Sequence, residues 1–180
     1  ELPPGRIPIT TVHRFETARA SVMDFVKTEL EKGRQIYFIY PLIEESEKLS
    51  FEDLMQGYEQ VKSFFPEPKY RISMVHGRQP ADQKETNMAR FVSGDTQIMV
   101  STTVIEVGVN VPNASVMVIE SSEKFGLSQL HQLRGRVGRG RERAYAYFLY
   151  EDGKPLSETA ADRLQTIAVN NELGSGMQVA

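Results

Sequence analysis

Three short apolar runs constrain the fold of this chain more than any other feature of its sequence. They lie at residues 35–40 (QIYFIY), 97–101 (QIMVS) and 115–120 (SVMVIE). Each run is shorter than an ordinary helix and is rich in β-branched or aromatic side chains, which favours a strand. Because neighbouring positions within a run are apolar, each strand is expected to be buried on both faces. The sequence therefore predicts the centre of a covered parallel sheet.

Segments with a helical pattern separate these strands. An apolar stripe predicts a helix over residues 17–32, which Gly33 ends. Ser50 with Asp53 resembles a capping box that opens a helix over residues 51–65. Further helices are predicted over residues 80–92, 127–137 and 157–169, and further strands over residues 9–13, 70–75 and 144–150. This alternation predicts an α/β fold with a mostly parallel sheet and helices on both faces.

Polar and glycine-rich residues follow three of the predicted strands. His76-Gly77-Arg78 follows one, Thr102-Thr103 follows another, and an arginine-glycine helix lies between the last two strands. Ligands of such sheets bind outside the carboxyl ends of the strands, so we expect these groups to gather there. Hydroxyls, backbone N–H groups and an arginine at this edge can bind phosphate groups. The alternative is that Thr102 caps a turn and Gly77 only permits a positive φ.

Composition narrows the class of protein. A chain of 180 residues with 40% hydrophobic and 25% charged content fits one globular domain, and no apolar run is long enough to cross a membrane. There is no cysteine, and the three histidines are far apart, so no protein-held metal is expected. The proline-rich start (ELPPGRIPIT) does not resemble a signal peptide. These features suit a cytoplasmic protein.

The formal net charge of −3 conceals two oppositely charged segments. Residues 131–143 (HQLRGRVGRGRER) carry five arginines, and residues 44–53 (EESEKLSFED) are acidic. Arg136 and Arg139 are three positions apart and would share one side of a helical turn. A guanidinium is a planar fork that binds two phosphate oxygens, so this pair would meet one γ-phosphate. A solvated basic surface is the alternative that arginine content alone leaves open.

Two segments resemble motifs of superfamily 2 helicases. Residues 132–139 (QLRGRVGR) resemble motif VI, and residues 101–114 (STTVIEVGVNVPNA) resemble motif V. Together with PLIEESEKL, VHGR and the opening ELPPGR, this block resembles the RecG family of ATP-dependent DNA helicases. The resemblance implies that residues 1–155 form the second RecA-like motor domain, a three-layer unit with motifs IV to VI. Residues 156–180 would begin the following helical coupling region, which is truncated.

The resemblance also implies roles for individual residues. Arg136 and Arg139 would be arginine fingers that touch ATP held by a partner domain, and Gln132 would order the same interface. Gly108 and Asn110 would lie at the nucleotide. Family members commonly carry an aspartate at the position of Asn110, and asparagine can still bond to the ribose, although without charge. The implied contacts to the DNA backbone are His76, Gly77, Arg78, Thr102 and Thr103.

A motor of this class needs groups that these residues lack. The sequence has no Walker A loop, and no D-E-x-x run follows a strand. ATP and Mg²⁺ would therefore be held mainly by a first RecA-like domain, and the chain by itself is expected neither to hydrolyse ATP nor to unwind DNA. The expected partners are that first domain and branched DNA, such as stalled forks, or single-stranded DNA.

Other functions remain open on the sequence. The transcription-repair coupling translocase shares the motif V to VI block. In a non-catalytic nucleic-acid-binding module, the arginines would attract the phosphate backbone only through their charge. A dinucleotide-binding enzyme is disfavoured because no G-x-G-x-x-G follows the first strand. The acidic loop from Glu44 to Glu47 is either a solvated surface or a face turned toward another domain.

Overall fold

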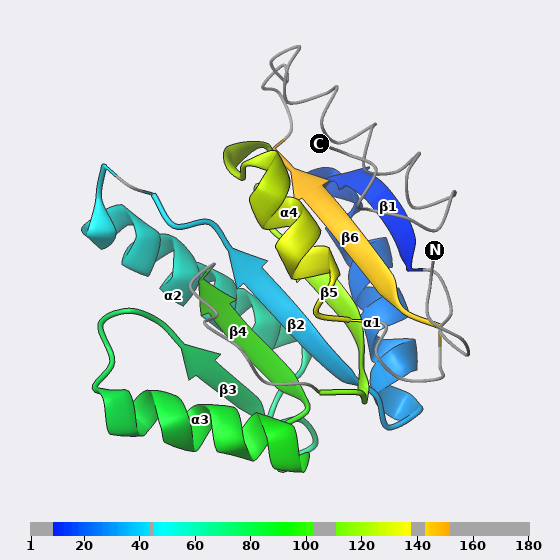
Figure 1. The fold of residues 1–180 in the computed structure, drawn as a ribbon. Coiled ribbons are helices and arrows are strands. Elements are labelled where there is room, and N and C mark those ends of the chain that lie inside the picture. The colour runs from blue at the N-terminus through cyan, green and yellow to red at the C-terminus, as the bar shows by residue number, and fades with distance from the viewer. Residues whose placement is uncertain (1–8, 44, 103–110, 138–142, 152–180) are drawn as a thin grey trace.

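The central sheet contains the strands that the sequence predicts. The computed structural model describes residues 9–43, 45–102, 111–137 and 143–151. Within these residues, six parallel strands form one sheet in the order β1-β6-β5-β2-β4-β3 (Figure 1). The strands are β1 (Thr10–Phe15), β2 (Gln35–Tyr40), β3 (Ile72–Val75), β4 (Ile98–Thr102), β5 (Ala114–Ile119) and β6 (Tyr145–Tyr150). Each strand begins and ends within two residues of the position predicted for it.

Helices cover both faces of the sheet, which confirms the predicted α/β class. One face carries α1 and α2, and the other carries α3 and α4 (Figure 1). The helices are α1 (Arg19–Glu31), α2 (Glu47–Phe64), α3 (Ala81–Ser93) and α4 (Leu127–Arg134), with short 3-10 turns η1 (Glu16–Ala18) and η2 (Ser122–Lys124). The predicted helix over residues 157–169 lies outside the described residues.

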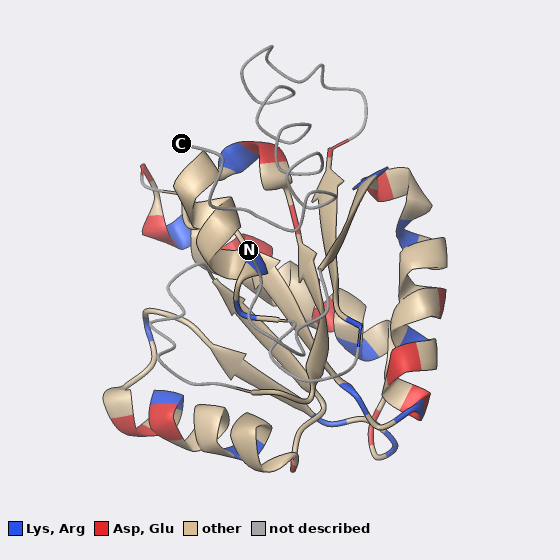
Figure 2. Ribbon diagram, turned by 45° about the vertical axis from the view of Figure 1, so that its right-hand side comes forward, with Lys and Arg blue, Asp and Glu red and all other residues tan. Residues whose placement is uncertain are grey.

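Alternation along β2 divides the apolar core into two layers. Ile36 and Phe38 pack with α1 and α2, whereas Tyr37 and Ile39 pack on the side of α3 and α4. All four are at most 1% exposed, and burying a side chain of this size contributes about 1.5–3 kcal/mol. Charged residues lie mainly on the helices and loops (Figure 2), and Arg14 is the only charged residue in the described strands. The sheet is thus an apolar scaffold whose chemistry lies at its edges.

The start of α2 differs from the prediction. Ser46 is the N-cap, because its hydroxyl accepts a hydrogen bond from the Leu49 amide at 3.1 Å. Ser50, the predicted cap, lies one turn inside the helix, where its buried hydroxyl accepts from the Ile43 amide at 2.6 Å. That bond ties the segment after β2 to α2. The earlier start places Glu47 in the first turn of the helix, beside the carboxyl ends of the strands.

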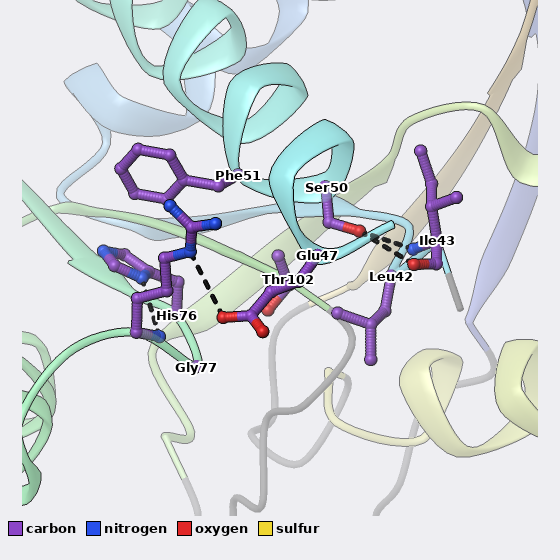
Figure 3. Close-up of a pocket in the computed structure, with 9 residues that line it drawn as sticks. Leu42, Ile43, Glu47, Ser50, Phe51, His76, Gly77 and Thr102 are labelled. Atoms are coloured by element: carbon purple, nitrogen blue, oxygen red, sulfur yellow. Dashed lines mark hydrogen bonds and ion pairs between the residues drawn. The ribbon is translucent and has the colours of Figure 1, made fainter. Parts of the chain in front are cut away.

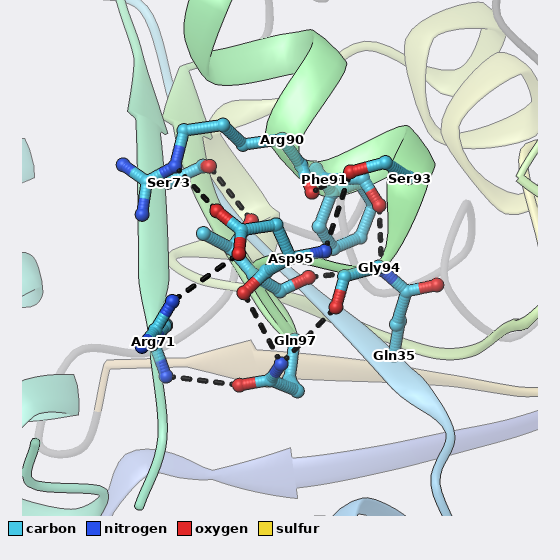
Figure 4. A network of polar contacts seen from close by, with 10 residues as sticks. Gln35, Arg71, Ser73, Arg90, Phe91, Ser93, Gly94, Asp95 and Gln97 are labelled. Atoms are coloured by element: carbon cyan, nitrogen blue, oxygen red, sulfur yellow. Dashed lines mark hydrogen bonds and ion pairs between the residues drawn. The ribbon is translucent and has the colours of Figure 1, made fainter. Parts of the chain in front are cut away.

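A polar network at the amino ends of β3 and β4 fixes where α3 meets the sheet (Figure 4). Asp95 accepts hydrogen bonds from Arg90 Nε at 3.0 Å and from Arg71 Nη1 at 3.2 Å. The bond from Arg90, together with the charges of both arginines, lowers the pKa of Asp95 below its usual value. Gly94 ends α3 with a φ of 86°. This network lies at the edge opposite the carboxyl ends and serves the fold.

Candidate nucleic-acid and nucleotide interface

A cavity of about 350 Å³ opens where β2, β3 and β4 end side by side. We call it the carboxyl-edge pocket. Its walls come from the segments that follow these strands and from the start of α2 (Figure 3). They are Leu42, Ile43, Glu47, Ser50, Phe51, His76, Gly77, Arg78 and Thr102. The structure therefore brings together four of the five residues predicted to contact DNA, and the fifth, Thr103, lies outside the described residues.

Hydrogen bonds within the turn after β3 fix its shape. The Arg78 amide donates to His76 Nδ1 at 3.2 Å, and the His76 amide donates to Gln79 Oε1 at 3.0 Å. Because Nδ1 accepts a hydrogen bond, the neutral imidazole carries its proton on Nε2. Burial, with the nearby charges of Lys84 and Arg78, lowers the pKa of His76 from its ordinary value of 6.5. The ring is therefore neutral at physiological pH and offers Nε2–H as a donor.

Gly77 does not adopt the positive φ that was the alternative explanation for a glycine at this position. Among the described residues, the glycines with positive φ are Gly33 and Gly94. A Cβ added at Gly77 would meet nothing within 4 Å. Within the described residues, neither a positive φ nor crowding requires glycine at this position.

Arg78 contacts two side chains of α2, those of Glu47 and Phe51. Its Nε donates to Glu47 Oε1 at 3.2 Å, and its guanidinium carbon lies 4.9 Å from the centre of the Phe51 ring. His76 packs against the edge of the same ring, with 5.1 Å between ring centres. Within the described residues, the two terminal amino groups of Arg78 make no hydrogen bond. The guanidinium is oriented but retains its bidentate donors.

Thr102 presents a buried hydroxyl at the pocket wall. The residue is 3% exposed, and its Oγ1 has no hydrogen-bond partner within the described part of the chain. Leaving such a group unsatisfied costs about 1–3 kcal/mol. The hydroxyl also caps no described turn, contrary to the alternative reading of this residue. An oxygen of a bound phosphate would supply the missing partner.

The arginine-bearing end of α4 lies away from this pocket. α4 follows η2 near the carboxyl end of β5 and runs back toward the amino ends of the strands (Figure 1). There Arg134 Nη1 lies 3.5 Å from Thr11 Oγ1, near the start of β1. The prediction that the arginines gather at the carboxyl edge is therefore wrong for Arg134 and Arg136. A helix that connects parallel strands must return the chain to the opposite edge.

The segment after α4 separates two arginines that look alike in sequence. Arg134 is 6% exposed, and burial lowers its pKa. Arg136 is half-buried, and its side chain has no hydrogen bond or ion pair within the described residues. The helix ends at Arg134 rather than at Val137, and the Arg136 amide donates to Leu133 O at 2.9 Å. Arg136 thus lies two residues beyond the helix, and because Arg139 lies outside the described residues, the predicted spacing of the pair stays a prediction.

The other predicted nucleotide residues are only partly described. Gln132 is exposed on α4. Gly108, Asn110 and Arg139 lie outside the described residues. Val111, which directly follows Asn110, is buried in the same apolar cluster as Leu133 and Val137. The ends of motif V and of α4 therefore pack into one core layer.

Sequence reasoning missed a second cavity of about 350 Å³, lined by residues of α1 and α2 at the carboxyl ends of β2 and β5. Arg19 forms a two-pronged ion pair with Glu120 there, with 2.7 Å between Nη2 and Oε1. The Tyr40 ring packs directly on Gly57, where an added Cβ would lie 2.2 Å from a ring carbon. Two features of the sequence could have indicated this contact: Gly57 lies in the middle of a predicted helix, and Tyr40 ends the predicted strand before it.

Two negative findings concern the described residues only. They contain no cluster of three or more His, Cys, Asp or Glu side chains that could hold a metal ion. None of the helices within these residues has the length and apolar character needed to cross a membrane.

Parallel topology, motif V and motif VI together define the class of protein. The chain belongs to the family of the helicase conserved C-terminal domain, whose model matches residues 19–141. A more particular relationship emerges from individual relatives.

The curated relatives are RecG helicases. The chain is 47% identical over 173 residues to ATP-dependent DNA helicase RecG of Escherichia coli (strain K12), covering 96% of this chain and 24% of that protein. It is 49% identical over 180 residues to RecG of Aquifex aeolicus (strain VF5), covering 100% of this chain and 22% of that protein. The predicted resemblance to the RecG family is confirmed. The chain spans about a quarter of the length of these relatives.

Solved structures of similar proteins support the same family and fold. A structure of RecG bound to a three-way DNA junction aligns with 100% of this chain, which corresponds to 22% of the RecG chain. The TM-score is 0.81 and the sequence identity is 38%. The structure of the yeast DEAD-box splicing factor Prp28 aligns with 96% of this chain, which corresponds to 34% of the Prp28 chain. The TM-score is 0.65 and the sequence identity is 18%. The second match, at low identity, shows only that the RecA-like helicase fold is shared.

Proposed function

We propose that this domain is the second motor domain of an ATP-dependent DNA helicase that remodels branched DNA such as stalled forks. In this proposal residues 1–155 are the motor domain, and residues 156–180 begin a helical coupling region. ATP binds between this domain and a first RecA-like domain, which holds most of the Mg²⁺ coordination. Each cycle of closing and reopening moves the two domains alternately along one DNA strand.

The observation that carries the proposal is the contrast between Arg134 and Arg136. Arg134 is buried against β1, whereas Arg136 is half-buried and has no carboxylate partner within the described residues. In this proposal the Arg136 guanidinium, which no carboxylate of the described residues neutralises, meets the surface of the partner domain. Stabilising charge on a transferring phosphoryl group with such a side chain is worth about 10³-fold or more in rate.

The remaining residues divide between two tasks. Arg139 acts beside Arg136 at the γ-phosphate, Gln132 orders the domain interface, and Gly108 with Asn110 contacts the nucleotide. At the carboxyl-edge pocket, the donors for backbone phosphates are His76 Nε2–H, the Gly77 amide, Arg78, and the hydroxyls of Thr102 and Thr103. These contacts read no base edges, so this site binds DNA without sequence preference.

The test is a charge-conserving substitution in the complete protein that carries this domain. Arg136→Lys is expected to lower DNA-stimulated ATP turnover about 10³-fold, because a lysine cannot reproduce the planar fork, with DNA affinity largely retained. Arg143→Lys is the matched control, since Arg143 is exposed in the same segment and contacts Thr10 Oγ1 at 3.4 Å.

The same pair of variants distinguishes the alternative of a non-catalytic binding module. If the arginines act only through charge, Arg136→Lys and Arg143→Lys will behave alike, and ATP turnover will be nearly normal in both. A second measurement concerns the 180-residue chain alone. Lacking a Walker A loop, it is expected to release no phosphate from ATP above background, with or without DNA.

A further inference from the structure

We infer that Glu47 weakens the grip of the carboxyl-edge pocket on the DNA backbone by neutralising Arg78, so that the domain releases each phosphate readily. The inference rests on the proposed function, because it assigns a role within the same DNA site. It also gives a role to one residue of the acidic loop whose sequence left its purpose open.

The geometry places the two charges in direct contact. Glu47 lies in the first turn of α2, and its Oε1 accepts from Arg78 Nε at 3.2 Å. Among the described residues, no other carboxylate forms an ion pair with Arg78. The Phe51 ring supports the guanidinium from the side, with 4.9 Å between its centre and the guanidinium carbon (Figure 3). The two terminal amino groups remain for a phosphate, which would then lie close to the Glu47 carboxylate.

Stability does not explain this ion pair. The side chains of Arg78 and Glu47 are 42% and 72% exposed. Exposed pairs of this kind contribute little to folding, because water screens both charges and long side chains lose freedom. A glutamate in the first turn of a helix also interacts favourably with the helix dipole, but that benefit does not depend on Arg78. Because both side chains are exposed, a ligand in solvent can reach the guanidinium and compete with Glu47 for it.

The electrostatic consequence has a definite sign. A phosphate that binds the terminal amino groups meets a neutral pair instead of a lone cation, and it is repelled by the carboxylate. At separations of about 5 Å in water, repulsion between single charges changes a binding constant about 3- to 10-fold, and less as salt is added. A motor must break each phosphate contact once per step, so a weakened contact favours movement over retention.

The experiment measures the affinity of the complete protein for single-stranded DNA over a range of salt concentrations. Glu47→Gln keeps the shape and a hydrogen-bond acceptor but removes the charge. It is expected to tighten binding about 3- to 10-fold at low salt. It should also steepen the slope of log K against log salt by about 0.7, because one more phosphate is effectively neutralised by the protein.

Glu45→Gln is the matched control. Glu45 is exposed two residues away and has no ion pair within the described residues, so its removal changes net charge equally. It should raise affinity clearly less than Glu47→Gln does, because its charge forms no ion pair with Arg78 and the surrounding salt screens it. In an Arg78→Gln background no guanidinium holds a phosphate beside Glu47, so Glu47→Gln should have little effect. Thermal unfolding of each variant checks that the fold is intact.

Several results overturn the inference, and they are distinguishable from failure of the proposed function. An unchanged or weaker affinity of Glu47→Gln defeats it, as does an equal gain in Glu45→Gln or a gain that persists without Arg78. If Arg78→Gln weakens DNA binding in these cases, the DNA site of the proposed function still stands. If Arg78→Gln has no effect, the pocket does not bind the backbone, and both proposals fail there.

Discussion

The carboxyl-edge pocket and the arginine-bearing end of α4 differ in how complete they are within this chain. The pocket is a cavity open to solvent, and hydrogen bonds hold the turn after β3 and tie Arg78 to Glu47 of α2. At the end of α4, Arg134 is fixed against β1, but Arg136 has no described side-chain partner. The first region is organised by contacts among the described residues, whereas at the second we propose that Arg136 meets another surface.

The largest expected effect comes from comparing one substitution in each region, because the two should affect different activities. In the complete protein, Arg136→Ala should lower DNA-stimulated ATP turnover about 10³-fold while the dissociation constant for single-stranded DNA changes little. Thr102→Val should do the reverse, weakening DNA binding about 3- to 10-fold, the value of one hydrogen bond. Steady-state turnover at saturating DNA and fluorescence anisotropy measure the two quantities.

This separation would break down in a recognisable way. A loss of turnover in Thr102→Val that saturating DNA does not restore would mean that the hydroxyl serves the nucleotide side. Valine has nearly the volume of threonine and removes a hydroxyl that lacks a described partner. The variant should therefore fold at least as stably as the parent.

The completeness of the pocket depends on how the end of β2 is held. Gly57→Ala places a Cβ 2.2 Å from the ring of buried Tyr40, which directly precedes the pocket segment. Overpacking of this kind costs about 1–3 kcal/mol, although alanine recovers about 1 kcal/mol of helix propensity. We expect a net loss of up to about 2 kcal/mol in the free energy of unfolding, measured by urea titration of the 180-residue chain.

Gly77→Ala is the control for that measurement, since a Cβ at Gly77 meets nothing within 4 Å. Its stability should change by less than about 0.5 kcal/mol. Its DNA affinity should fall, because the added methyl lies where the backbone of a ligand approaches. Equal destabilisation of both glycine variants would show that the Tyr40 contact relaxes easily.

The two arginines of the other region offer the same kind of comparison at smaller scale. Arg134→Ala should destabilise the chain by about 1–2 kcal/mol, because it removes buried packing and polar contacts between α4 and β1. Arg136→Ala should change stability by less than about 0.5 kcal/mol. Urea unfolding followed by circular dichroism gives both values. Similar losses in the two variants would mean that Arg136 also supports the fold.

Particular residues show how far the sequence could predict this molecule. The runs QIYFIY and SVMVIE identify buried strands because local composition and burial agree. The start of α2 was missed because Ser46 and Ser50 are both good caps, and only the contact of Ser50 with Ile43 distinguishes them. The resemblance identified Arg78 and Arg136 as site residues. The partner of Arg78, Glu47, is 31 positions away, and the burial of Arg134 depends on β1, so local patterns reveal neither.

The smallest expected effect compares the histidines of the two regions. Burial lowers the pKa of His76 at the pocket and of His131 on α4 below 6.5. The unfolded chain therefore binds more protons than the folded one as pH falls through 6.5, so stability decreases from that pH downward. In His76→Asn the decrease should be shallower, because asparagine can still accept the Arg78 amide and does not titrate. Urea unfolding at pH 7.5, 6.5 and 5.5 tests this, and an identical pH dependence in parent and variant would contradict it.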